Sequence, residues 1–272
     1  MKIACLQPSI SIVLERLGCL DLVAACTRYC VDAVPALRDR GIAVVHDSWS
    51  TTAEELLGVQ PDLVIASVPY RQESLTAILK AGVPVLTLAP HSLKDIEQDM
   101  RLIAGATGRS EALDRAEMVI REMRDEIEAV RQHCAGPAAR PLVYCEEWGK
   151  PLIASQLWVQ ELVEAAGGMF LGEPGKTTTA EAVAERDPEV VIAAWCGAGD
   201  RVPLEKVAAR PGWEAMRAVR GGRVYCIADE LLNTPAPTLV DGLRAIAAAL
   251  HPNDFGPTRG LRRMARSRAE SI

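Results

Sequence analysis

Apolar residues recur every three or four positions from Ser110 to His133, which predicts one long helix near the middle of the chain. Ser110 is a suitable N-cap, and a Gly-Pro pair follows the pattern. The other faces are densely charged. The apolar stripe comprises Leu113, Ala116, Ile120, Met123, Ile127 and Val130. We expect this helix to be a backbone that joins the segments on its two sides.

Two stretches on either side of this helix resemble each other. Residues 51–67 read TTAEELLGVQPDLVIAS and residues 178–194 read TTAEAVAERDPEVVIAA. In both, a helix-start signal comes first, a Pro-acid pair ends the helix, and a short β-branched run typical of a buried parallel strand follows. The repeat therefore predicts two related α/β lobes.

Short apolar strands alternate with helical segments along most of the chain, which predicts an α/β fold of two Rossmann-like lobes with mostly parallel sheets. In the first lobe a loop is expected at Arg28-Tyr29-Cys30, followed by a short helix at 33–40. The expected divisions are an N-terminal lobe at 1–90, a helical connector at 91–137, a C-terminal lobe at 138–251 and a basic flexible tail at 252–272.

Composition narrows the class of protein. The 272 residues are 49% apolar and 24% charged, as in soluble globular proteins, and the net charge of −6 gives no reason to expect a nucleic-acid partner. The longest apolar runs are too short to span a bilayer. Met1-Lys2 leads straight into a predicted strand, so we expect a cytoplasmic monomer, or a periplasmic one if the start is misassigned or a signal was trimmed.

Aromatic residues make up 4% of the chain, yet most of them lie at predicted loops instead of core positions, and five follow predicted strands. Tyr29, Trp49 and Tyr70 do so in the first lobe, and Trp148 and Trp195 in the second. Ligands bind at the carboxyl ends of strands in open α/β sheets, and flat rings suit a large planar or macrocyclic ligand. Each residue alone could equally pack on its own lobe, but the set favours an aromatic cleft between the lobes.

Cys30 and Cys196 each follow an aromatic residue at the end of a strand. A thiolate from each lobe could ligate a soft metal or a corrinoid cobalt, and Glu146 could add an oxygen ligand. Partly buried thiols are the favoured alternative. None of the eight cysteines forms a CxxC pair, so neither a zinc site nor a redox dithiol is indicated. No GxSxG, HExxH, P-loop or GxGxxG motif is present, and we expect neither catalysis nor a covalent cofactor.

The order of several segments resembles a known family. PSISIVLERLG, TAEELLGVQPDLVI, GVPVLTL, LIAGATGR, the long helix, VQELVEAAGG, TAEAVAERDPEVVI and GRVYCI together resemble the class III, helical-backbone substrate-binding proteins of ABC importers. These are receptors for vitamin B12, ferric siderophores and haem. The resemblance covers residues 2–251 and is closest to the cobalamin binders, whose cleft Tyr and Trp match Tyr29 and Trp49.

The resemblance implies a protein that captures a cobalamin-type corrinoid in the interlobe cleft for an ABC importer. It also implies that Glu54 and Glu181, one per lobe, meet arginines of the permease. Cys30 and Cys196 are not part of the cobalamin-binder pattern. The alternative is a cytoplasmic carrier or sensor of a metal chelate, such as a ferric siderophore, haem or a thiolate-bound metal, not coupled to transport. An enzyme related to nitrogenase-type subunits is a third class, but the cluster-ligand cysteine spacing is missing.

Overall fold

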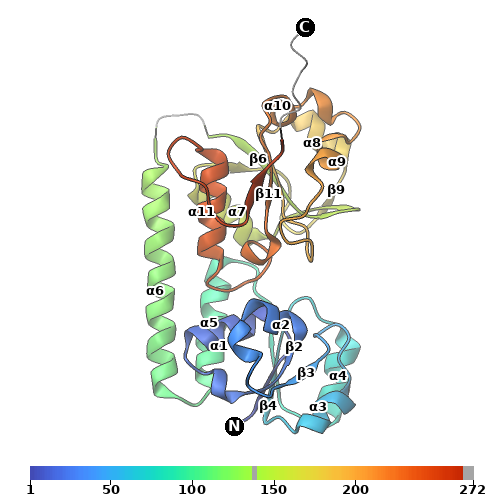
Figure 1. Ribbon diagram of the computed structural model, residues 1–272, viewed down its shortest axis with the longest axis vertical. Coiled ribbons are helices and arrows are strands. Elements are labelled where there is room, and N and C mark those ends of the chain that lie inside the picture. The colour runs from blue at the N-terminus through green and yellow to red at the C-terminus, as the bar shows by residue number, and fades with distance from the viewer. Residues whose placement is uncertain (137–139, 266–272) are drawn as a thin grey trace. The chain divides into compact units, whose positions relative to one another are not determined.

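The computed structural model describes residues 1–136 and 140–265, and the chain divides into two compact units (Figure 1). Unit 1 comprises Met1–Glu122 and Pro235–Pro237, and unit 2 comprises Met123–Thr234 and the chain from Thr238 onward. Each unit has its own β-sheet, and the predicted α/β class is confirmed. The boundary between the units falls inside the long helix, whereas the sequence pattern placed a separate connector at residues 91–137.

The sheet of unit 1 has five parallel strands in the order β3-β2-β1-β4-β5. Central strand β1 pairs with β2 on one side and β4 on the other, so that Ile3 is in register with Val23 and Leu63. The strands are β1 (Ile3–Cys5), β2 (Val23–Thr27), β3 (Ala43–Val45), β4 (Leu63–Ser67) and β5 (Val85–Leu88). Because helices cover both faces of the sheet, the inner strands β1 and β4 are buried at almost every consecutive position and are therefore apolar along their length.

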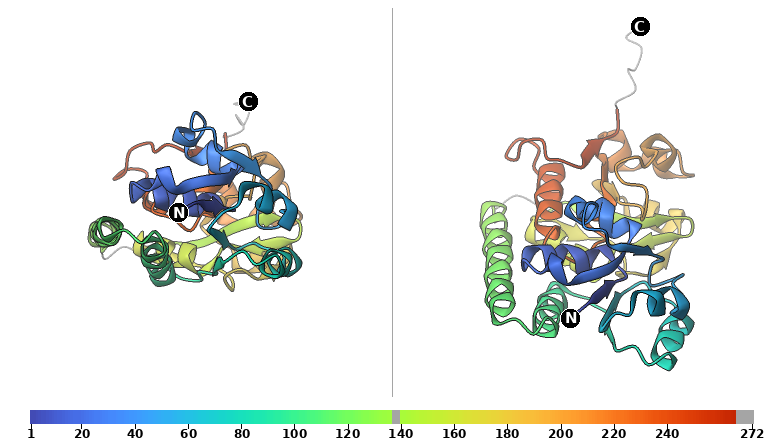
Figure 2. Two further views of the ribbon diagram at one scale, coloured as in Figure 1. Left: turned by 90° about the horizontal axis from the view of Figure 1, so that it is seen from below. Right: turned by 60° about the horizontal axis from the view of Figure 1, so that its bottom comes forward.

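Helices cover both faces of this sheet (Figure 2). The first two helices and α5 pack together, and α3 packs against α4. The helices are α1 (Pro8–Arg16), α2 (Arg28–Ala33), α3 (Ala53–Val59), α4 (Gln72–Lys80) and α5 (Leu93–Ala106), with single 3-10 turns at Leu20–Leu22 and Pro35–Leu37. The core between the sheet and α3 and α4 includes Leu6, Leu56, Val64 and Ile78.

Helix α6 (Ser110–His133) has the predicted bounds, although Ser110 is its first residue and not a cap. Ala116, Ile120, Met123 and Val130 of the predicted stripe are buried. Leu113, the first residue of the predicted stripe, is exposed. The buried stripe begins instead at Ala112, one residue earlier.

The sheet of unit 2 is mixed, in the order β12-β11-β10-β6-β7-β9, and β8 pairs with β6. Its central strands are parallel, whereas the β6-β7, β7-β9 and β11-β12 pairs are antiparallel. The strands are β6 (Leu142–Gly149), β7 (Leu152–Ala154), β8 (Met169–Phe170), β9 (Thr177–Thr178), β10 (Val190–Ala193), β11 (Val224–Ile227) and β12 (Leu261–Arg263). The sequence pattern did not predict β7, β8, β9 or β12, because two or three residues are too few to show alternation.

Five α-helices lie entirely within unit 2, among the residues that the structure describes. They are α7 (Leu157–Ala165), α8 (Ala180–Arg186), α9 (Leu204–Ala208), α10 (Arg217–Arg220) and α11 (Leu239–Leu250), with 3-10 turns at Trp213–Ala215 and Asp229–Leu231. Trp213 is the largest fully buried side chain and packs edge-on against Tyr144 of β6, with ring centroids 6.0 Å apart.

The internal repeat is a structural repeat. Thr52 caps α3 and Thr179 caps α8, each accepting a hydrogen bond from the backbone N–H three residues ahead. Both helices end at a left-handed residue, Gln60 with φ 53° and Asp187 with φ 45°. A buried parallel strand, β4 or β10, follows in each copy.

Two expectations are corrected. Arg28-Tyr29-Cys30 is not a loop but the start of α2, and the helix expected at 33–40 ends at Ala33 because Pro35 interrupts it. In the expected flexible tail, residues 261–263 form β12 on the edge of a sheet, while residues 266–272 lie outside the described residues.

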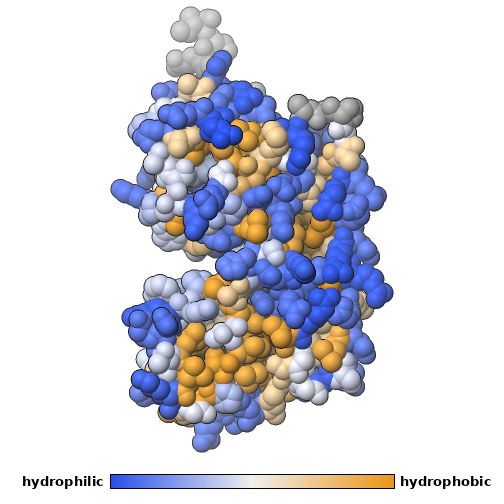
Figure 3. All heavy atoms as spheres, turned by 180° about the vertical axis from the view of Figure 1, so that it is seen from behind, coloured by the Kyte–Doolittle hydropathy of each residue, from blue (hydrophilic) through white to orange (hydrophobic). Residues whose placement is uncertain are grey.

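No helix within the described ranges is long and apolar enough to cross a membrane. Figure 3 shows a largely hydrophilic face, with apolar residues gathered on part of unit 1.

Candidate functional site

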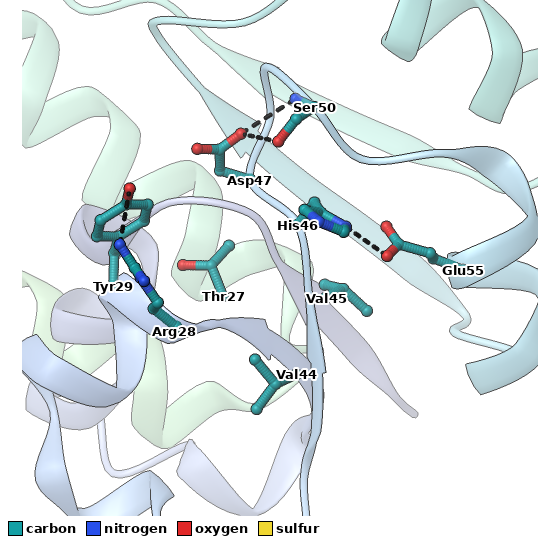
Figure 4. A pocket seen from close by; sticks show the side chains of 9 residues that line it. All are labelled: Thr27, Arg28, Tyr29, Val44, Val45, His46, Asp47, Ser50 and Glu55. Carbon is teal, nitrogen blue, oxygen red and sulfur yellow. Dashed lines mark hydrogen bonds and ion pairs between the residues drawn. The ribbon is translucent and has the colours of Figure 1, made fainter.

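A pocket of about 330 Å³ opens in unit 1 at the carboxyl ends of β2 and β3 (Figure 4). We call it the unit 1 pocket. It is lined by Thr27, Arg28, Tyr29, Val44, Val45, His46, Asp47, Ser50 and Glu55. Carboxyl ends of parallel strands are the usual ligand-binding edge of an open sheet, so the pocket lies where such a fold binds its ligand.

Tyr29 is held at the mouth of this pocket by the start of α2. Thr27 accepts a hydrogen bond from the backbone N–H of Cys30 and so caps the helix. The ring of Tyr29 is 47% exposed, and the guanidinium of Arg28 lies 5.0 Å from its centroid. Tyr29 therefore offers a ligand an exposed aromatic ring beside the positive charge of Arg28.

The loop after β3 is fixed by its own polar side chains. Asp47 Oδ1 accepts hydrogen bonds from Ser50 Oγ at 2.7 Å and from the backbone N–H groups of Trp49 and Ser50. His46 Nδ1 lies 2.5 Å from Glu55 Oε1 in the first turn of α3. Burial alone would raise the pKa of Glu55, but hydrogen bonds from His46 and the Thr52 backbone lower it below its ordinary value.

The other two aromatic candidates of unit 1 lie outside the lining of this pocket. Trp49 is 54% exposed in the same loop as His46, and Ser74 of α4 donates to its carbonyl. Tyr70 follows the cis Val68–Pro69 bond and is half-buried against the core of the unit.

Unit 2 has a pocket of about 590 Å³ at the carboxyl ends of β6 and β10, which we call the unit 2 pocket. It contains three sequence-predicted residues, Trp148, Trp195 and Cys196. The remaining lining is Gly149, Lys150, Gly197, Ala198, Pro203, Lys206 and Arg210. The expectation that the aromatic residues of both lobes share one cleft stays a prediction.

Trp195 is oriented by a buried ion pair. Its indole N–H donates to Glu146 Oε1 at 2.8 Å, and Arg210 donates to both oxygens of the same carboxylate at 2.8 and 2.9 Å. Glu146 is fully buried at the end of β6, and the Arg210 guanidinium lies 4.6 Å from the ring centroid of Trp213. Both oxygens of Glu146 therefore accept hydrogen bonds from protein donors, and its candidate role as a metal ligand stays a prediction.

Gly149 lets the indole of Trp195 lie against the backbone of the β6–β7 hairpin. A Cβ atom at position 149 would lie 2.4 Å from Trp195 Cζ2, closer than van der Waals contact permits. Trp148 is 44% exposed, and its indole N–H donates to the carbonyl of Lys150. The unit 2 pocket thus has one exposed indole on the hairpin, that of Trp148, and one indole packed against the hairpin, that of Trp195.

The two cysteine candidates lie in different units and in different surroundings, and a metal-ligand role for either stays a prediction. Cys30 is fully buried, with its thiol near Thr27 Oγ1 and the carbonyl of Cys5. Cys196 is exposed as a residue, but partial desolvation of its thiol, with the Glu147 and Asp229 carboxylates adding to it, raises the pKa above its usual range. Throughout residues 1–136 and 140–265, no group of three or more His, Cys, Asp or Glu residues could hold a metal ion.

The glutamates expected to meet a permease occupy equivalent places in the repeat. Glu54 is in the first turn of α3 and Glu181 is in the first turn of α8, and both are exposed. Hydrogen bonds from its own backbone and from Thr179 lower the pKa of Glu181. Acidic residues in a first turn also favour the helix dipole, so this position alone does not establish docking.

Sequence reasoning missed His46 and Arg210. His46 stands in the HDSWS loop beside the selected Trp49, and its partner Glu55 completes a Thr-x-x-Glu capping box, so a local signal existed. Arg210 meets Glu146 across 64 residues, and no local pattern reports such a pair.

Comparison with known proteins identifies the class. Residues 3–231 match the family model described as periplasmic binding protein, and the chain belongs to this family of solute-binding proteins, which are carriers and not enzymes.

Proteins similar to this chain are named for different ligands. The chain is 25% identical over 261 residues to a cobalamin-binding protein of Halobacterium salinarum, covering 92% of this chain and 69% of that one. It is 23% identical to an uncharacterised ABC transporter substrate-binding lipoprotein of Bacillus subtilis, covering 93% and 81%. In fold it is similar to a periplasmic haem-binding protein of Pseudomonas aeruginosa, with TM-score 0.79, 24% identity and 97% and 98% coverage. The periplasmic vitamin B12 binding protein of Vibrio cholerae gives TM-score 0.73, 19% identity and 92% and 96% coverage.

Proposed function

We propose that this protein captures a corrinoid of the cobalamin type and delivers it to an ABC importer. The observation that carries the proposal is the exposure of Tyr29, Trp49 and Trp148 at the carboxyl ends of strands in both units. Large aromatic side chains left exposed at a ligand-binding edge are typical of a surface that a partner covers. Their flat faces suit a macrocycle, which they contact over a large area at little entropic cost.

The Halobacterium salinarum relative supports a corrinoid over other chelates, because it is named for cobalamin and matches 92% of this chain. Haem is the competing ligand, because a haem-binding protein shares the fold over nearly the whole chain. Both ligands are planar metal macrocycles, so aromatic faces alone do not separate them.

Calorimetric titration with cobalamin, cobinamide and haemin tests the ligand. Trp49→Ala and Trp195→Ala should each weaken corrinoid binding by about 1 kcal/mol or more, as the loss of an aromatic anchor does. Leu79→Ala is the matched control, because Leu79 is an exposed apolar residue of α4 outside the lining of both pockets. Stronger binding of haemin than of either corrinoid would replace the proposed ligand, and failure of all three to bind would refute ligand capture by these residues.

Delivery requires a surface that meets the importer, and we assign this role to Glu54 and Glu181. Two separated carboxylates can each form charge-assisted hydrogen bonds with permease arginines. The double variant Glu54→Lys, Glu181→Lys should keep its ligand affinity and lose binding to the importer in detergent or nanodiscs. Glu73→Lys with Glu185→Lys is the control, because it makes the same charge change at exposed positions of α4 and α8.

Importer binding that survives both reversals would favour a carrier or sensor not coupled to transport. Cell fractionation separates the same alternatives, because delivery to an importer needs the protein outside the cytoplasmic membrane. A cytoplasmic location would count against the transport role.

A further inference from the structure

The imidazole of His46 is oriented for coordination. Its Nδ1 faces the Glu55 carboxylate at 2.5 Å, and a carboxylate accepts hydrogen bonds, so Nδ1 carries the proton. In the neutral imidazole the lone pair is then on Nε2. Within the chain segments that the structure describes, Nε2 has no hydrogen-bond partner.

The partner of this imidazole is itself fixed by the start of α3. Glu55 Oε2 accepts from the backbone N–H of Thr52 at 3.4 Å and from Thr51 Oγ1 at 3.3 Å, while the Glu55 N–H donates to Thr52 Oγ1. The capping box thus holds the carboxylate, and the carboxylate holds the ring. Histidines that bind metals in proteins usually donate their second ring N–H to a carboxylate or carbonyl in this way.

The free side of the ring belongs to the unit 1 pocket. The His46 side chain is 66% exposed, and Figure 4 shows Glu55 on the side of His46 that faces away from Tyr29. No group of three ligating side chains stands among the described residues, so this position cannot hold a bare ion. A metal that arrives already chelated needs only one more ligand, and a single imidazole supplies it.

We propose that Nε2 of His46 coordinates the metal of the bound chelate at an axial position, an inference that rests on the proposed capture of a corrinoid or a related macrocycle. In an aquo form of the ligand this position holds water. The metal–water bond breaks, the bond from the Nε2 lone pair to the metal forms, and water leaves, with no change in the oxidation state of the metal. Imidazole suits both cobalt and iron, so the same residue serves either macrocycle.

Visible spectroscopy of the whole protein with aquocobinamide tests the proposal, because this corrinoid carries exchangeable axial water. Binding should change the cobalt bands from those of the aquo form to those that free imidazole produces with the same corrinoid. His46→Gln should bind at least tenfold more weakly with the aquo bands unchanged. Glu55→Gln should keep the imidazole bands but weaken binding about tenfold, since it loosens the ring. His91→Gln is the matched control, because His91 is an exposed histidine outside the pocket lining, and it should behave as the wild type.

Dicyanocobinamide in excess cyanide shows whether the His46→Gln pocket is intact, because cyanide blocks both axial positions. The variant and the wild type should bind it equally. Identical bands for wild type and His46→Gln with aquocobinamide would overturn the inference and leave corrinoid capture standing. Binding of haemin alone, with an iron spectrum that depends on His46, would refute the corrinoid and support the coordination. No binding of any macrocycle would overturn both.

Discussion

The two copies of the internal repeat share a backbone but present different chemistry at the strand ends. Strands β4 and β10 follow equivalent helices with equivalent caps. Unit 1 places His46 and its capping-box partner at the pocket, whereas unit 2 places an aromatic side chain backed by the buried Glu146–Arg210 pair. The scaffold is therefore repeated, and the chemistry differs because Glu55 stands where the second copy has Ala182 and because the other side chains come from outside the repeat.

The largest difference in stability between variants of the two units should come from the buried Glu146–Arg210 ion pair. Glu146→Ala leaves the guanidinium of Arg210, which is only 12% exposed, without its partner and should destabilise the protein by about 3–5 kcal/mol. Glu122→Ala is the control, because it breaks an exposed pair with Arg16 and should cost less than about 1 kcal/mol. Urea unfolding followed by tryptophan fluorescence measures both, and equal costs would show that the pair has no special role in unit 2.

A smaller, pH-dependent effect is expected from Glu147. Burial raises its pKa from 4.5 to about 6, although a hydrogen bond from Gln156 opposes the shift. The folded state then holds this proton more tightly than the unfolded state, so the contribution of Glu147 to stability is greatest below pH 4.5 and is lost as the pH rises to about 6. The fall should be about 1–2 kcal/mol, and Glu147→Gln should remove it. If the stability of Glu147→Gln falls with pH as steeply as that of the wild type, the pH dependence comes from other groups.

Loss of the N-cap of α3 or of α8 should lower the stability of the protein by about 1 kcal/mol, and the two losses can be compared. Thr52→Ala and Thr179→Ala each remove an N-cap hydrogen bond, which typically costs about 1 kcal/mol. The loss should be greater in α3, because Thr52 takes part in a reciprocal capping box and Thr179 does not. Serine at either position should restore most of the stability, and a greater loss at Thr179 would contradict the difference.

The smallest effects should come from the left-handed residues that end the two helices, and they should differ in sign. Gln60→Gly relieves a conformation that side chains disfavour and should stabilise the protein by about 0.5 kcal/mol. Asp187→Gly should not stabilise, because Asp187 also accepts from the backbone and guanidinium N–H groups of Arg217. Thermal unfolding of both variants checks this, and stabilisation by both would mean that the bonds to Arg217 contribute little.

Local patterns predicted the scaffold well where they were long or repeated. Helix α6 was predicted with both of its ends, because 24 residues give many turns of one periodicity. The repeat marked α3 and α8 because each begins at a threonine cap and ends before a Pro-acid pair. Strands β8 and β9, with two residues each, carry no such pattern.

The candidate sites were predicted only in part, because their residues are positioned by distant contacts. The exposure of Tyr29 and Trp148 agrees with their predicted places near the carboxyl ends of strands, Tyr29 two residues after β2 and Trp148 in the last two residues of β6. Partial burial of the Cys30 thiol was the favoured interpretation, but its complete burial was not predicted, because it depends on α2 starting directly at the end of β2. Arg210 reaches Glu146 from the segment after α9, a contact that only the folded unit brings about.

Strand order also bears on how the chain folds as it leaves the ribosome. The five strands of unit 1 all lie within residues 3–88, so its sheet can be complete while most of the protein is still unmade. The edge of the unit 2 sheet is β12, whose residues 261–263 pair with β11 more than thirty positions earlier in the chain. During synthesis the outer edge of β11 therefore stays unpaired until this late segment emerges. An unpaired edge can form hydrogen bonds with a strand of another chain. Unit 2, more than unit 1, is the part of the nascent chain that a chaperone would need to cover.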